Sequence, residues 1–143
     1  MREKELRLAL VFFGGISLAV YMHGISKEIL KLVRASSALH AIPDPAARLQ
    51  ADAATAFDPA DPEYDTEAVY FDLLREIGAR VDLRVVVDII AGASAGGVNG
   101  VMLARALAHN LSFGRLRDLW LRDADVTELT KQARLIQKHY GRP

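Results

Sequence analysis

The 143-residue sequence contains no cysteine, which excludes disulfides, thiol catalysis and cysteine-based metal sites. It also lacks net charge, because 18 basic residues balance 18 acidic ones, so no bulk electrostatic attraction to a nucleic acid is expected. The four histidines (His23, His40, His109 and His139) are scattered without the paired spacing of a zinc site. No G-x-G-x-x-G or G-K-[ST] motif occurs either. We therefore expect one domain with no metal, no cofactor and no nucleic-acid partner.

Charge is absent from residues 8–26, which contain no Lys, Arg, Asp or Glu. A signal peptide or membrane anchor is one interpretation of such a run. Two acidic residues before this run, Glu3 and Glu5, and its interruption at Gly14-Gly15 favour a different interpretation. In this interpretation the segment forms a strand over 6–13, a glycine turn, and a helix from Ile16 to about Ser36. The apolar face of that helix is expected to comprise Leu18, Met22, Ile25, Ile29, Leu32 and Val33. On this basis the protein is expected in the cytoplasm or peripheral to a membrane.

The most informative stretch follows a β-branched run at 85–90, which predicts a strand buried on both faces. Directly after it come Gly92-Ala93-Ser94-Ala95-Gly96 and Gly97, and then a predicted helix from Ala95 to about His109. A G-x-S-x-G motif between strand and helix indicates a nucleophile elbow, which presents the serine at the start of the helix. The glycines and alanines keep the turn free of bulky side chains. In the alternative interpretation, Ser94 only caps the helix.

Gly14 and Gly15 also allow two interpretations. They form either a plain tight turn or a loop whose bare backbone N–H groups can hold an anion, as in an oxyanion hole.

Between these motifs, residues 37–62 hold four of the five prolines and few large apolar residues, so we expect a mobile surface insertion. A helix from about Tyr64 should end at Gly78 as its C-terminal cap. After the elbow helix, Ser112 is a candidate N-cap for a helix over 113–122, with Leu116, Leu119 and Trp120 turned inward. A weak last helix is expected over 126–140. The predicted order is β, α, insertion, α, β, α, α, α.

Two glycine motifs in this order resemble those of the patatin-like phospholipases: VFFGGIS after the first strand and IIAGASAGGVNG after a later one. The runs SLAVYMHGISKEI and LRDLWL are similar to bacterial patatin-related proteins of that family. The resemblance implies an α/β, three-layer patatin-like fold with a mainly parallel sheet, of which residues 1–143 form the N-terminal part. It also implies a lipid acyl hydrolase with a Ser–Asp dyad.

In the resemblance, Ser94 is the nucleophile, and the oxyanion hole consists of backbone N–H groups of Gly14, Gly15, Ile16 and Ala95. The substrate implied is a phospholipid or another acyl-ester lipid, met at a membrane surface. Phe13 and Ser17 stand where the family usually has a further glycine and a basic residue. The acyl chain could lie against Phe12, Phe13, Leu18 and Met102, although such residues are more often ordinary core.

The family's catalytic aspartate lies in an Asp-Gly dipeptide, and this sequence has none. Asp118, Asp123 and Asp125 follow Ser94 but fall in or beside a predicted helix, so none is assigned the role. We expect the aspartate in a further part of the same polypeptide. Two alternatives stay open: an ordinary α/β-hydrolase esterase using His109 or His139, and a non-catalytic lipid-binding or interaction module.

Overall fold

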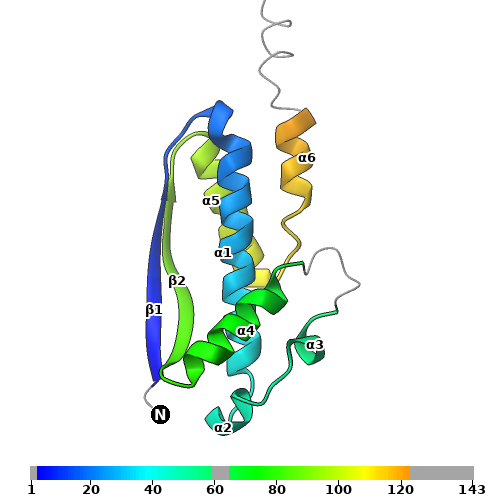
Figure 1. The fold of residues 1–143 in the computed structure, drawn as a ribbon. Helices are drawn as coiled ribbons and strands as arrows, with labels where there is room; N and C mark the ends of the chain where they lie inside the picture. Colours follow the sequence, from blue (N-terminus) through cyan, green and yellow to red (C-terminus); the bar gives the residue numbers. More distant parts are fainter. Residues whose placement is uncertain (1–2, 59–64, 123–143) are drawn as a thin grey trace, which may run out of the picture.

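The structure, a computed structural model, describes residues 3–58 and 65–122. Two parallel strands, β1 (Glu3–Phe12) and β2 (Asp82–Gly92), form the sheet, and the helices lie on one side of it (Figure 1). Between the strands come a 3-10 turn, η1 (Ile16–Leu18), and the helices α1 (Ala19–His40), α2 (Pro45–Arg48), α3 (Ala53–Ala56) and α4 (Glu67–Gly78). After β2 follow α5 (Ala95–His109) and α6 (Arg115–Arg122). The expected α/β class is confirmed.

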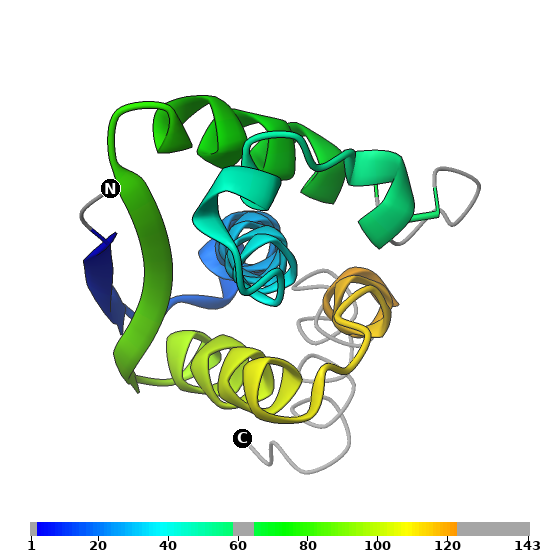
Figure 2. The same ribbon diagram turned by 90° about the horizontal axis from the view of Figure 1, so that it is seen from below.

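The register of the two strands brings both glycine motifs to one end of the sheet. Phe12 pairs with Gly92, the last residue of each strand, after a register shift between Leu8 and Ala9. Because parallel strands run the same way, the loops that follow them emerge side by side. Helix α1 covers the sheet, with α4 on one flank and α5 on the other (Figure 2).

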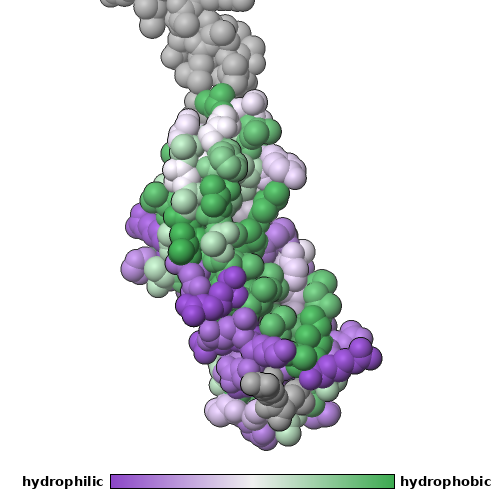
Figure 3. All heavy atoms as spheres, turned by 90° about the vertical axis from the view of Figure 1, so that its left-hand side faces the viewer, coloured by the Kyte–Doolittle hydropathy of each residue, from purple (hydrophilic) through white to green (hydrophobic). Residues whose placement is uncertain are grey.

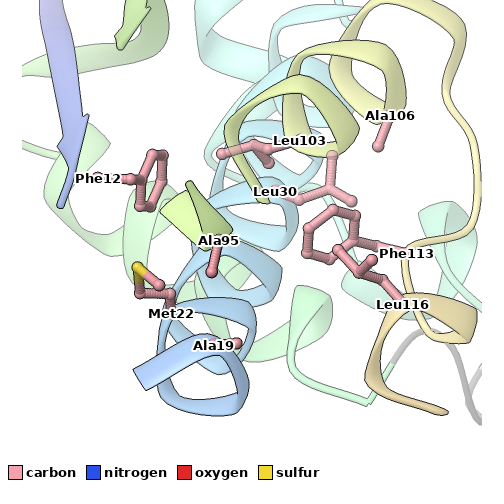
Figure 4. Close-up of a cluster of buried hydrophobic side chains, with 9 residues drawn as sticks. All are labelled: Phe12, Ala19, Met22, Leu30, Ala95, Leu103, Ala106, Phe113 and Leu116. Carbon is pink, nitrogen blue, oxygen red and sulfur yellow. The ribbon is translucent and has the colours of Figure 1, made fainter. Parts of the chain in front are cut away.

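The core has two parts, one on each side of α1. The part near the glycine motifs joins the end of β1 to α1, α5 and α6 (Figure 4) and consists of Phe12, Ala19, Met22, Leu30, Ala95, Leu103, Ala106, Phe113 and Leu116. The other joins α1, α3, α4 and β2 and consists of Ala35, Leu39, Ala53, Phe57, Phe71, Leu74 and Val85.

Helix α1 differs from its prediction in extent and in its buried face. It begins at Ala19 and continues to His40, whereas the sequence pattern predicted Ile16 to Ser36. Leu18 and Ile25, expected to be buried, are 51% and 43% exposed. Small residues are buried instead, and the Ser36 hydroxyl accepts a hydrogen bond from the Val85 N–H at 2.8 Å. A helix that packs this closely on a strand needs short side chains there, which a hydrophobicity pattern does not register.

Strand β2 is buried on one face only, so the prediction of burial on both faces is wrong for the described residues. Ile89 is 60% exposed on the outer face, and Val11 of β1 is 61% exposed. Arg7 and Asp88 also pair on this exposed side, with Nε and Oδ2 2.7 Å apart. Figure 3 looks onto this side of the molecule: hydrophobic residues cover much of its upper part, toward the carboxyl ends of the strands, and hydrophilic residues gather below.

The segment 37–62 is more ordered in its described part than the sequence indicated. Asp44 and Asp52 cap α2 and α3, each accepting a backbone N–H at 3.0 Å. Phe57 is buried and meets Phe71 edge-on, with ring centroids 6.1 Å apart. Arg48 donates to Asp82 at 2.6 Å. The expectation that this segment has little to bury is therefore wrong for residues 37–58, and its mobility stays a prediction.

Three smaller differences concern helix ends. Gly78 is the last residue of α4 rather than its C-cap. The C-cap is Ala79, whose φ of −60° is helical rather than left-handed. Helix α6 begins at Arg115, two residues later than predicted, while Leu119 is 40% exposed rather than turned inward. The expected helix over 126–140 lies outside the described residues.

Candidate active site

Ser94 occupies the turn between β2 and α5 in a backbone conformation that serine rarely adopts. Its φ and ψ are 53° and −129°, and its residue position is exposed. Such a conformation costs about 1–3 kcal/mol and persists only where the surroundings enforce it. Its side chain makes no capping hydrogen bond to α5, which removes the interpretation of Ser94 as a side-chain cap. The turn thus has the strained, outward geometry of a nucleophile elbow.

Close backbone contacts explain the two glycines of the motif. A Cβ on Gly92 would lie 2.6 Å from the carbonyl oxygen of Gly96. A Cβ on Gly96 would lie 2.4 Å from the carbonyl oxygen of Phe12, at the end of the neighbouring strand. Both distances are too short for any side chain. Gly96 therefore lets α5 begin directly against the end of β1.

The same packing brings the first glycine turn to Ser94. A Cβ on Gly14 would lie 2.9 Å from the Ala93 carbonyl oxygen and 3.0 Å from the Ser94 Cβ. Gly15 has a φ of +132°, where L side chains are strained. Ile16 opens η1, and Ala95 opens α5, so their N–H groups are among those without an acceptor inside their own helix. The structure thus brings Ser94 and the expected oxyanion loop together.

Asn99 fixes these loops relative to one another, a role that the sequence analysis missed. Its buried amide nitrogen donates to the carbonyls of Ala19 at 3.3 Å and Ala95 at 3.1 Å. Its amide oxygen accepts the indole N–H of Trp120 at 3.3 Å. One side chain thereby ties the starts of α1 and α5 to α6. The signal for it was a single amide among the small and apolar residues of α5.

No general base faces Ser94 in the part of the chain that the structure describes. The Ser94 hydroxyl makes no hydrogen bond to a described residue. His109 ends α5, so at about 1.5 Å per residue it lies roughly 20 Å along the helix from Ser94. Asp118 pairs with Arg117 on α6, at 3.5 Å. Asp123, Asp125 and His139 lie outside the described residues.

His23 and Glu28, both on α1, have shifted pKa values. Burial, then Lys27 and Arg117, lower the pKa of His23, which stacks on Phe113. Burial raises the pKa of Glu28, but hydrogen bonds from Thr66 and Tyr70 outweigh it, so that its pKa is lowered overall. Glu28 thereby links α1 to the start of α4.

The stretches of β1, α1, β2 and α5 nearest Ser94 carry no charged residue. Residues 8–26 and 89–104, which meet there, contain no Lys, Arg, Asp or Glu. Of the side chains expected along the acyl chain, Phe12 is core, whereas Phe13 and Leu18 are 78% and 51% exposed and Met102 is partly exposed. Other exposed apolar residues in these stretches are Val11, Ile16, Val20, Tyr21, Val98 and Val101.

Neither metal ligands nor a membrane span is found where the structure describes the chain. No group of three His, Asp or Glu side chains there could hold a metal ion. No described helix has the length and apolarity needed to cross a bilayer.

Comparisons with known proteins are sparse. No family model matches the chain, and no solved structure matches it. Over 132 residues, which is 92% of the chain, it is 33% identical to a protein of Mycobacterium tuberculosis described as an uncharacterized membrane protein. The chain spans only 11% of that protein's length, so it is similar to one part of a much longer polypeptide.

Proposed function

We propose that the chain is the nucleophile-bearing part of a patatin-like serine acyl hydrolase that cleaves carboxylic esters of lipids. The observation that carries the proposal is the exposed Ser94, held at φ 53° against Gly14 at the start of α5. A strained serine beside a second glycine turn suits acyl transfer, because the turn can supply backbone N–H groups to the oxyanion. The uncharged, apolar surroundings support a lipid substrate over a polar one.

In the proposed reaction, Ser94 Oγ attacks the ester carbonyl carbon and gives its proton to an aspartate in a further part of the same polypeptide. The N–H groups of Gly14, Gly15, Ile16 and Ala95 hold the oxyanion, and one such donor contributes about 3–4 kcal/mol in serine hydrolases. The proton then passes to the departing alcohol as the C–O bond breaks. Water hydrolyses the acyl-enzyme and regenerates the hydroxyl.

The patatin-like, three-layer architecture is part of the proposal. The described sheet has two strands, and in the larger fold the apolar outer face at Val11 and Ile89 would be buried by further strands and helices. The longer relative supports a larger polypeptide around this segment.

Ester turnover tests the proposal. The full-length protein should hydrolyse p-nitrophenyl esters, and Ser94→Ala should abolish this while Ser37→Ala, an exposed serine at the far end of α1, leaves it unchanged. Residues 1–143 alone should be near background, because we expect the catalytic aspartate in a further part of the same polypeptide. Equal activity of Ser94→Ala and Ser37→Ala would refute the proposal.

A non-catalytic lipid-binding module is the second candidate. It is favoured by the absence of a hydrogen-bond partner for the Ser94 hydroxyl among the described residues. Lipid binding that persists in a protein with no turnover would identify this function.

A further inference from the structure

A groove of about 520 Å³ is lined by residues of α1 and by residues at and before the start of α6. Helix α6 lies on the side of α1 turned away from the sheet (Figures 1 and 2). Five basic side chains line it against one acidic one: Lys27, Lys31 and Arg34 of α1, with Arg115, Arg117 and Asp118 of α6. The whole chain has no net charge, so this is a local concentration of positive charge.

Two of these cations are already bound to other groups of the protein. Lys31 is 1% exposed, contacts the Asp65 carboxylate and lies 3.6 Å from Glu28. Arg34 donates to the Leu111 carbonyl at 2.7 Å. Neither group is available to a ligand without breaking these contacts.

The other three cations form only weak ion pairs, or none, with the described residues. Arg117 meets Asp118 only at 3.5 Å, with both side chains at least half exposed, and such pairs are weak. Lys27 approaches Asp65 only at 3.7 Å. Arg115 is exposed and forms no ion pair with a described residue. Positive charge from two helices is therefore directed to one groove.

A buried polar atom at the groove also lacks a partner. His23 lines the groove, is 3% exposed and stacks on Phe113 with ring centroids 4.8 Å apart. Its Nδ1 has no hydrogen-bond partner among the described residues. Burial and the nearby Lys27 and Arg117 lower the pKa of His23, which keeps the ring neutral, with one N–H to donate. A buried polar atom normally has a partner, so this nitrogen is open to a water molecule or to a polar group of a bound ligand.

The start of α6 adds to the preference for an anion. Gly114 and Arg115 line the groove where this eight-residue helix begins, and the first N–H groups of a helix carry partial positive charge. The rest of the lining includes the apolar Val20, Leu30 and Phe113.

We propose that this groove binds an organic phosphate ester, with the phosphate among Lys27, Arg115 and Arg117 and the organic part against Phe113 and Leu30. Arginine pairs favourably with phosphate oxygens, and the apolar lining accommodates more than a bare ion. The ester is either a soluble metabolite or a lipid headgroup. This binding does not depend on Ser94 or on hydrolysis.

Fluorescence of the single tryptophan, Trp120 on α6, can report binding in the full chain. The probes are sn-glycerol 3-phosphate, with glycerol as its uncharged control, and phosphatidylcholine vesicles with and without phosphatidic acid. The test variant is Arg115→Ala/Arg117→Ala. The matched control is Arg80→Ala/Arg84→Ala, which removes the same charge from exposed positions outside the groove.

We expect a saturable change with a phosphate-bearing probe, weakened about tenfold or more in Arg115→Ala/Arg117→Ala and unchanged in the control. His23→Phe, which preserves the ring stack, should also weaken it. A response to glycerol phosphate identifies a soluble ligand, and a response only to phosphatidic acid vesicles identifies a lipid headgroup. No saturable response to either probe, or equal loss in the two double variants, overturns the proposal.

Discussion

Phe57→Ala tests whether the segment between α1 and α4 belongs to the core. Phe57 follows α3, is 9% exposed, and packs edge-on against Phe71 within the cluster formed by α1, α3, α4 and β2. Replacing it with alanine removes the ring and leaves a cavity that the neighbouring helices fill only in part. The sequence pattern, by contrast, predicted a mobile surface insertion with few large apolar residues to bury.

The expected loss is large. Truncation of a buried phenylalanine costs about 3–5 kcal/mol, and the slight exposure of Phe57 places it near 3 kcal/mol. That is a substantial share of the roughly 5–15 kcal/mol by which domains are stable. For a chain of this size it corresponds to a fall in Tm of about 10 °C.

Urea unfolding followed by Trp120 fluorescence and by circular dichroism measures the change. Val69→Ala on α4 is the control, because Val69 is 64% exposed and should cost less than about 0.5 kcal/mol. If Phe57→Ala destabilises the protein no more than Val69→Ala, Phe57 does not belong to the core, and the prediction of a mobile surface insertion is supported instead.

Three further substitutions give distinct outcomes. Gly96→Ala should strongly destabilise the protein in thermal unfolding, because the new Cβ would clash with the Phe12 carbonyl. Gly24→Ala, whose Cβ would meet nothing within 4 Å, should instead stabilise the protein by about 0.5–1 kcal/mol. Equal effects of the two variants would contradict the close contact between Gly96 and Phe12. Gly15→Ala in the active full-length protein should lower kcat, because alanine is strained at a φ of +132° and would shift the N–H groups that hold the oxyanion. A loss of activity explained wholly by unfolding would contradict the oxyanion role. The folded-state pKa of His23 is lowered, so the unfolded chain binds more protons and stability should fall as pH drops below about 6.5; an unchanged pH profile in His23→Phe would contradict this.

Local signals were enough to predict the elements around Ser94. The β-branched run, the glycine turn and the small residues after it are adjacent in sequence, and α5 spans Ala95–His109 as predicted. The pairing of the two glycine motifs was implied by the resemblance to the patatin-like phospholipases, and the parallel strands account for it, since loops after parallel strands share one end of the sheet.

Features that depend on distant partners could not be predicted in this way. The buried face of α1 is set by its close approach to β2, where Ser36 meets Val85. Burial of Phe57 depends on Phe71, and the exposure of Ile89 reflects which elements cover the sheet. The Asn99 link joins three helices through one amide, for which no local pattern exists.

The assignment of Ser94 as a nucleophile is tested most directly by a fluorophosphonate, which labels only an activated serine. The full-length protein is treated with the probe, and the modified peptide is identified by mass spectrometry. We predict an adduct on Ser94 and none on the exposed Ser37. A folded full-length protein that remains unlabelled at Ser94 would contradict the proposed acyl hydrolase.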